Sequence, residues 1–149
     1  MEKDLDPEAF SLLRAVLALS RRMRAERPEG AVSLAAISLL GTLGRLGPMP
    51  AVQLAAEERL QPQSLTRIVA SLEREGLIAR QKDMTDQRAL IIALTGKGKT
   101  VLADDLRARQ AWLRDAMLIV LSKEERAALI GAADIMLKLA FHLTQESEA

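Results

Sequence analysis

The sequence predicts a mainly α-helical fold that contains one small β-hairpin. Three observations carry this prediction. Most of the 149 residues show helical spacing of apolar side chains, two short helices follow one another across a tight turn, and residues 77–82 and 89–94 are short runs rich in strand formers. Helix, turn, helix and hairpin follow in that order within residues of about 48–94. This order predicts a winged helix-turn-helix flanked by further helices.

The helix pair has a clear second member. Residues 51–59 form the first predicted helix, and Pro62 opens the second, because proline at the first helical position loses no hydrogen bond. The apolar positions of the second helix share one face: Leu65, Ile68, Val69 and Leu72. The opposite face is polar around one small residue: Gln63, Arg67, Ala70 and Arg74, flanked by Ser64, Ser71 and Thr66. Such a face suits a DNA major groove, although an ordinary solvated helix shows the same pattern.

The predicted hairpin has a long polar tip at residues 83–88. Gly76 stands where a left-handed helix end is expected, and the first strand follows it. Residues two apart in a strand share a face, so Asp86 can hold Arg88 in one orientation. A guanidinium aimed outward suits a narrow minor groove, where the negative potential is enhanced.

With these motifs the chain resembles the MarR-type (multiple antibiotic resistance regulator) transcriptional regulators of bacteria and archaea. The resemblance covers nearly the whole chain. The matching residues are Leu54 and Ala55; Ser64, Leu65, Thr66 and Arg67; Leu72, Glu73, Arg74, Glu75, Gly76, Leu77 and Ile78; Asp86, Gln87 and Arg88; and Leu94, Thr95 and Gly98. The resemblance implies a single domain over residues 1–149 and a homodimer that binds a pseudo-palindromic operator. It also implies a repressor that often releases DNA when a small molecule binds.

Ten side chains are expected to contact DNA. Gln63, Ser64, Thr66 and Arg67 would enter the major groove, Arg88 the minor groove with Asp86 orienting it, and Gln61, Arg74, Arg80 and Lys82 would meet phosphates. A twofold dimer predicts inverted half-sites about one helical turn apart. Lys97 and Lys99 oppose the dipole at a helix start, and phosphate contacts are one explanation for them.

Three residues depart from the family pattern. Glu58 stands where a leucine or isoleucine is usual, Arg59 replaces a turn glycine, and Gln61 replaces a serine N-cap. We expect Glu58 to turn to solvent, because glutamate is rarely buried. If it is buried, Arg59, Arg67 or the amides of the next helix are the expected partners.

The remaining helices are expected to form a dimer scaffold. They are predicted at residues 7–27, 32–46 and 95–121, followed by a last helix that Ser122 and Glu125 open with a capping box. The last helix carries an apolar stripe: Leu129, Ala133, Met136, Leu137 and Ala140, with Phe141 beside it. Residues of about 5–30 and 95–146 are therefore expected to pack between subunits, although the stripes could instead close the protomer's own core.

Net charge gives no support for DNA binding. The chain carries a formal charge of +1, and residues 54–94 hold six basic and six acidic side chains. The prediction depends on where these charges lie. Few phosphate contacts also predict weak non-specific binding.

Several function classes are excluded or disfavoured. There is no cysteine, which removes thiol redox sensing, and the lone His142 is expected to be structural, so neither a metal nor a cofactor is expected. The start of the chain lacks a signal-peptide core and no run is long and apolar enough to span a membrane, which predicts a cytoplasmic protein. The effector is unknown. Trp112 is a weak candidate for its pocket.

Two alternatives stay open at this point. Residues 93–100 satisfy a relaxed phosphate-loop pattern ending in Gly98, Lys99 and Thr100, but a nucleotide-binding enzyme would need a parallel sheet and a second, aspartate-bearing strand. A winged helix can also dock a protein instead of DNA. Conventional enzyme chemistry has little support, since Glu57 and Glu58 point about 100° apart on their helix.

Overall fold

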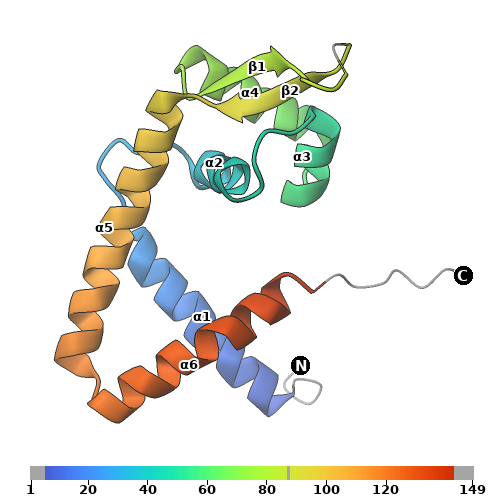
Figure 1. Ribbon diagram of the computed structural model, residues 1–149. Coiled ribbons are helices and arrows are strands. Elements are labelled where there is room, and N and C mark those ends of the chain that lie inside the picture. Colours follow the sequence, from blue (N-terminus) through green and yellow to red (C-terminus); the bar gives the residue numbers. More distant parts are fainter. Residues whose placement is uncertain (1–5, 87, 143–149) are drawn as a thin grey trace, which may run out of the picture. The chain divides into compact units, whose positions relative to one another are not determined.

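The computed structural model describes residues 6–86 and 88–142, so the predicted wing residue Gln87 and the outermost parts of the expected dimerisation segments lie outside the described residues. It confirms a mainly α-helical chain with a small antiparallel hairpin (Figure 1). The elements are α1 (Pro7–Arg24), α2 (Leu34–Leu46), α3 (Ala51–Glu58), α4 (Pro62–Arg74), β1 (Ile78–Lys82), β2 (Leu90–Leu94), α5 (Gly96–Val120) and α6 (Lys123–Ala140). The predicted helix at 7–27 ends three residues early, and the other bounds move by at most two residues.

The chain divides into two compact units. Met1–Arg109 forms the first, and Gln110–Ala149 forms the second, so that α5 crosses the boundary. The winged helix lies wholly in the first unit. The assignment of the whole chain to one domain stays a prediction.

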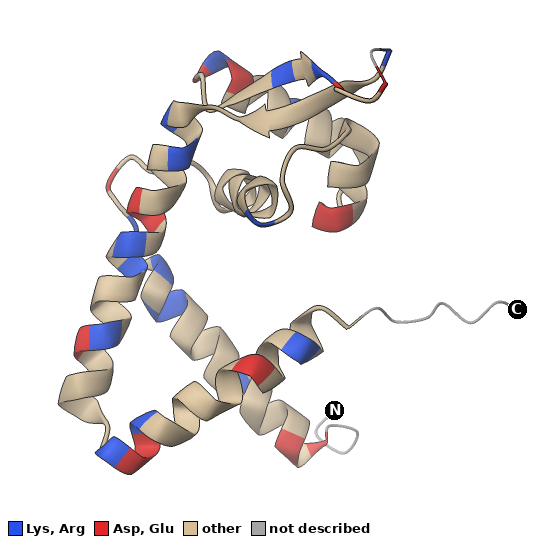
Figure 2. Ribbon diagram, viewed as in Figure 1, with Lys and Arg blue, Asp and Glu red and all other residues tan. Residues whose placement is uncertain are grey.

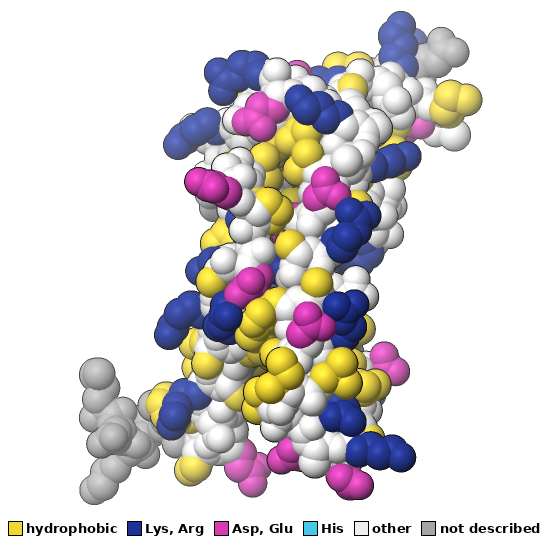
Figure 3. All heavy atoms as spheres, turned by 90° about the vertical axis from the view of Figure 1, so that its left-hand side faces the viewer, with side chains coloured by type: hydrophobic (Ala, Val, Ile, Leu, Met, Phe, Trp, Pro, Cys, Tyr) yellow, Lys and Arg dark blue, Asp and Glu magenta, His cyan; other side chains and the backbone are white. Residues whose placement is uncertain are grey.

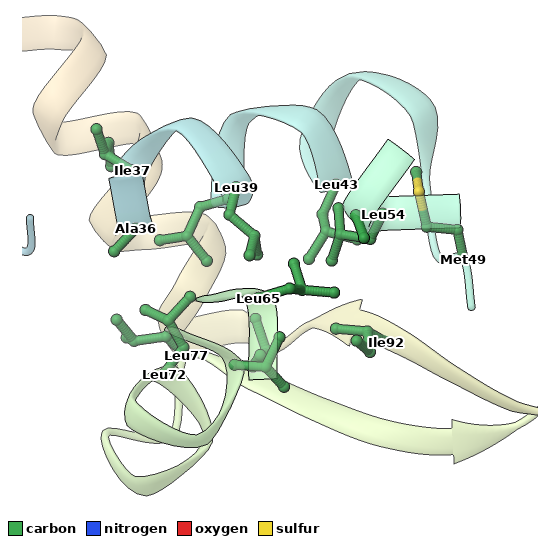
Figure 4. Packing of buried hydrophobic residues seen from close by; sticks show 14 residues of the cluster. Ala36, Ile37, Leu39, Leu43, Met49, Leu54, Leu65, Leu72, Leu77 and Ile92 are labelled. Atoms are coloured by element: carbon green, nitrogen blue, oxygen red, sulfur yellow. The ribbon is translucent and has the colours of Figure 1, made fainter. Parts of the chain in front are cut away.

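Helix α2 belongs to the core of the winged helix. Ala36, Ile37, Leu39, Leu40 and Leu43 of this helix are buried in the same cluster as residues of α3, α4 and the hairpin. Figure 4 shows Leu39 and Leu43 above Leu65 and Ile92. The expectation that residues 32–46 serve as dimer scaffold is therefore wrong for the buried face of α2. A helix with so many apolar positions finds its partner within the first unit because α3 and α4 are too short to enclose a core alone.

The hairpin is closed by a regular register and extended by one bridge. Ile78 pairs with Leu94 and Lys82 with Leu90, and Met49 forms an isolated bridge with Ile92. The bridge ties the segment before α3 to β2, with Met49 N to Ile92 O at 3.2 Å and Ile92 N to Met49 O at 2.8 Å. Both side chains are buried in the core. The wing therefore grows from a strand that is fixed on both edges at Ile92.

Helices α3 and α4 end in the same way. At the end of α4 the Leu77 amide donates to Leu72 O at 2.9 Å and the Gly76 amide to Glu73 O at 3.0 Å, with Gly76 at φ 74°. This pair of bonds is the Schellman motif. At the end of α3 the Leu60 amide donates to Ala55 O at 3.0 Å and the Arg59 amide to Ala56 O at 3.2 Å. Arg59 has φ 51° and is the one non-glycine residue with positive φ among residues 6–86 and 88–142.

The start of α5 is fixed closely against the end of α4. The Thr95 hydroxyl donates to Gly76 O at 2.6 Å and accepts from the Gly98 amide at 3.0 Å, and Lys97 Nζ donates to Glu75 O at 2.8 Å. A Cβ placed on Gly98 would lie 2.0 Å from Leu77 O. Only glycine allows this approach of two backbones.

A buried ion cluster joins α5 to the segment after α1. Asp105 has a side-chain exposure of 3%, and its Oδ2 accepts from Arg27 Nε at 2.7 Å. Arg109 Nη2 lies 2.6 Å from Oδ1 as an ion pair without hydrogen-bond alignment, and Arg27 Nη2 donates to Val32 O at 2.7 Å. Two cations therefore surround one buried carboxylate, which offsets its cost of desolvation.

The second unit buries little within one chain. The capping box of Ser122 and Glu125 is confirmed, with the two bonds at 2.8 and 3.1 Å, and Arg126 donates to Leu121 O at 2.7 Å. No residue of α6 is buried, nor is any residue of α5 between 110 and 120. Among the described helices, none has the length and hydropathy that crossing a membrane requires.

Gly98→Ala is expected to destabilise the protein by about 1–3 kcal/mol, because the new methyl group would overlap the Leu77 carbonyl. Gly41→Ala is the matched control, since a Cβ at that position of α2 meets nothing within 4 Å and removes the entropic cost of glycine. Urea unfolding of both variants measures the difference. Equal stability of the two would show that the Gly98 contact is not restrictive.

Asp105→Asn is expected to cost about 3 kcal/mol in unfolding free energy, because it leaves the buried Arg27 without its counter-charge. Asp104→Asn is the matched control. Its carboxylate pairs with Arg107 but is 54% exposed, so the loss should stay below about 0.5 kcal/mol. Similar losses at the two neighbouring positions in chemical denaturation would contradict a stabilising role for the buried cluster.

Candidate nucleic-acid interface

The outer face of α4 is available to a ligand. Gln63, Thr66, Arg67, Ala70 and Arg74 are exposed, and Ser64 and Ser71 are half-buried. Leu65, Val69 and Leu72 point into the core from the opposite face. The helix thus presents amide, hydroxyl and guanidinium groups around one alanine, which is a surface that can approach base edges closely.

The first turn of α4 has free backbone donors. Gln61 occupies the N-cap but its side chain makes no capping bond, and Pro62 follows it. The amides of Gln63 and Ser64 therefore have no acceptor within the helix. Thr66 behaves differently, because its hydroxyl donates to Pro62 O at 2.8 Å. In the free protein Thr66 is turned along its own helix, while the amides and Gln61 are open to an anion such as a phosphate.

Two aspartates order the tip of the wing. Asp83 Oδ1 accepts from the amide and from the hydroxyl of Thr85, both at 3.0 Å. The Thr85 amide is the main reason that the pKa of Asp83 lies below its ordinary value, and the Thr85 hydroxyl lowers it further. Because the pKa is lowered in the folded protein, the contribution of this turn is complete above the ordinary pKa and is lost as the pH falls through the folded value.

Asp86 acts on Arg88 through the backbone. Its Oδ1 accepts from the Arg88 amide at 3.1 Å, and its carbonyl accepts from the Ala89 amide at 3.0 Å. The expected bond from the Asp86 carboxylate to the guanidinium is not the contact seen, because the residues lie in a turn rather than two apart in a strand. Asp86 thereby fixes the direction of the chain at Arg88, and the Arg88 side chain is exposed.

Basic residues follow β1 towards the tip. Arg80 and Lys82 are exposed on this strand, and the basic positions of strand and wing are blue in Figure 2. Arg80 Nε lies 2.5 Å from Glu73 Oε1 of α4, and the two side chains are 44% and 34% exposed. Such an exposed pair holds its cation weakly. Arg80 is therefore oriented beside α4 and can exchange its partner at small cost.

Lys97 has a structural role. Its ammonium caps the carbonyl of Glu75 at the end of α4, where a cation also suits the helix dipole. This contact explains a lysine in the first turn of α5 without a phosphate. Lys99 is exposed.

Glu58 turns towards α2, not to solvent as expected from the sequence. Its Oε2 accepts from the Ser38 hydroxyl at 2.8 Å, and its Oε1 accepts from the Thr42 hydroxyl. None of the partners expected for a buried carboxylate is used. Two hydroxyl groups on one face of α2 satisfy the half-buried carboxylate instead, a pairing that requires knowledge of how α2 packs.

Charges of both signs are mixed over the surface. On the face drawn in Figure 3, Lys and Arg side chains lie among Asp and Glu side chains, with apolar side chains visible between them. No group of three or more metal-ligating side chains occurs within the described part of the chain. The arrangement fits recognition by placed side chains better than by a single-sign field.

The comparisons identify the family. The MarR family model matches residues 32–90, a range that includes α2. An HTH-type transcriptional regulator from Mycobacterium bovis is 39% identical over 88% of this chain and 91% of its own length. The HTH-type transcriptional repressor MdtR from Bacillus subtilis is 27% identical over 93% of this chain and 89% of its own length. A crystal structure of a transcriptional regulator from Pseudomonas aeruginosa has a TM-score of 0.82 and 32% identity, and covers 96% of this chain and 99% of that one.

The chain belongs to the MarR family and is a DNA-binding transcriptional regulator. Members of this family regulate transcription and are not enzymes. The phosphate-loop alternative also lacks its structural context, because the sheet formed by the described residues is a two-stranded antiparallel hairpin. Gly98 of that pattern serves the approach of α5 to Leu77.

Arg59→Gly is expected to stabilise the protein by about 0.5–1 kcal/mol, since it removes a left-handed side-chain penalty that exceeds the entropic cost of glycine. Gly76→Ala is the counterpart at the end of α4, where a Cβ meets nothing within 4 Å, so only the backbone conformation opposes it. It should destabilise by about 1 kcal/mol. Thermal and urea unfolding of both variants test this, and a loss of stability in Arg59→Gly would refute strain at this turn.

Proposed function

We propose that this protein is a ligand-responsive repressor that binds a pseudo-palindromic operator as a homodimer. The observation that carries the proposal is the outward polar face of α4 next to a wing that ends in an exposed arginine. The B. subtilis relative is named a repressor, which supports the same direction of control here.

The side chains divide between the grooves and the phosphates. Gln63, Ser64 and Arg67 read base edges in the major groove, and Thr66 joins them once its hydroxyl leaves Pro62 O. Arg88 enters the flanking minor groove from the turn that Asp86 orders. Phosphate contacts come from four further residues: Gln61, Arg74, Arg80 and Lys82. Arg80 exchanges Glu73 for a phosphate in this step.

The homodimer is supported by exposed apolar helices. Phe10, Leu13 and Leu17 on α1, and Met136 and Leu137 on α6, are all at least 40% exposed. No residue of α1 or of α6 is buried. Two helices so apolar are covered when a second copy packs on them, and a twofold dimer places two α4 helices on inverted half-sites about one helical turn apart.

Effector binding would act on the fit between two reading heads and this spacing. A ligand that favours one separation of the heads shifts the population towards it and changes operator affinity. Trp112 remains a candidate for an aromatic contact to the effector. It is half-buried in the second unit.

Arg67→Ala is expected to weaken operator binding by about 1–3 kcal/mol, because it removes a guanidinium that pairs with a base edge. Arg88→Ala should weaken binding and also reduce its dependence on salt. Fluorescence anisotropy with the DNA upstream of the protein's own gene, across a salt series, measures both.

Arg107→Ala is the control, since Arg107 is an exposed α5 cation that pairs with Asp104 and lies outside the proposed interface. Its operator affinity should equal that of the wild type. Tight wild-type binding that all three variants share would exclude the assigned reading residues.

A further inference from the structure

A cavity lies against α2 and α5 within the first unit. Its volume is about 630 Å³, and its walls include Leu34, Ile37, Leu102 and Leu106. The polar side chains that line it are Ser38, Arg45 and Arg109, and no carboxylate lines it among the described residues. Volumes of this order hold small organic molecules. Apolar walls with hydroxyl and guanidinium donors suit an apolar molecule that carries one anionic group.

Ser38 takes part in two features of the fold. It lines this cavity, and its hydroxyl donates to Glu58 Oε2 at 2.8 Å. A serine hydroxyl has a single proton to donate. It cannot serve Glu58 and an anion in the cavity at the same time, so occupancy of the cavity competes with the bond to Glu58.

Glu58 stands immediately before the turn that positions α4. It is the last residue of α3, it precedes the left-handed Arg59, and α4 begins at Pro62. The Thr42 hydroxyl, on a residue that is 8% exposed, holds the other carboxylate oxygen. Each oxygen of Glu58 therefore ties the end of α3 to α2 through one hydroxyl. Hydrogen bonds to a charged group are stronger than neutral ones, so losing one matters at this turn.

We propose that Ser38 is a positioning residue that couples this cavity to the recognition helix through Glu58. An apolar anion in the cavity takes the Ser38 proton, and its charge repels the nearby carboxylate. The end of α3 and the turn at Arg59 then loosen, and α4 loses its fixed approach to DNA. The readout on DNA rests on the proposed function above. Couplings between sites are typically about 5–150-fold in affinity, and we expect about tenfold here.

The site is tested with 8-anilino-1-naphthalenesulfonate, a fluorescent apolar anion. It should bind the wild type, and Leu106→Glu, which adds a carboxylate to the cavity wall, should weaken binding at least about tenfold, as like charges repel. Ile130→Glu adds the same charge to an exposed position of the second unit and is the matched control. Absent binding, or an equal loss in both variants, overturns the cavity as a site for such anions.

The coupling is tested on operator affinity with and without the probe. The probe should weaken wild-type binding about tenfold. Ser38→Ala should bind the operator about as weakly without the probe and respond no further, whereas Ser38→Thr keeps the hydroxyl and should keep both behaviours. Glu58→Leu, which restores the residue type usual in the family, should bind the probe normally but show no response on DNA. A full response in Ser38→Ala or Glu58→Leu overturns the coupling.

Hydrogen exchange separates this coupling from the DNA-binding proposal. The amides of Arg59 and Leu60 donate to Ala56 and Ala55 carbonyls at the turn. They should exchange faster in Ser38→Ala and in the probe-bound wild type, while the Ile92 amide keeps its protection. Faster exchange without any operator binding would support the coupling and refute the DNA proposal. Unchanged exchange at the turn refutes the coupling whatever the DNA result.

Discussion

The direction of the recognition helix depends on two left-handed residues, one at each side of it. Arg59 ends α3 three residues before α4 begins, and Gly76 reverses the chain two residues after α4 ends. Each makes the same pair of backbone bonds, so entry to and exit from α4 follow fixed angles. The hairpin and α5 both start from the second of these ends, through Leu77, Thr95 and Lys97. An error in either turn would therefore displace the whole DNA-facing surface.

Local sequence signals predicted what local forces decide. Pro62 and Gly76 mark the bounds of α4, the i, i+3, i+4 pattern of Leu65, Ile68 and Val69 gives its buried face, and Ser122 with Glu125 gives the start of α6. The exposed face of α4 follows from the same periodicity. Its use on DNA came from the family resemblance, because exposure alone does not distinguish a reading face from a solvated one.

Contacts between distant segments were beyond the sequence. The partners of Asp105 and of Glu58 lie 78 and 16 to 20 residues away, and no spacing rule connects them. The apolar pattern of α2 fitted scaffold and core equally well, until α3 and α4 proved too short to close a core without it. Asp86 failed for a local reason, since the wing tip is a turn in which side-chain oxygens meet amides before they meet a neighbouring guanidinium.

The second unit has a consequence for handling the protein. Helix α6 buries no residue within its own chain, so its apolar side chains gain no free energy from intramolecular packing. Its order is then linked by mass action to the molecule that covers it. The melting temperature of this unit should vary with protein concentration, while the first unit, which has its own core, keeps a constant one. Dilution would expose the C-terminal helix to proteases before it harms the reading head.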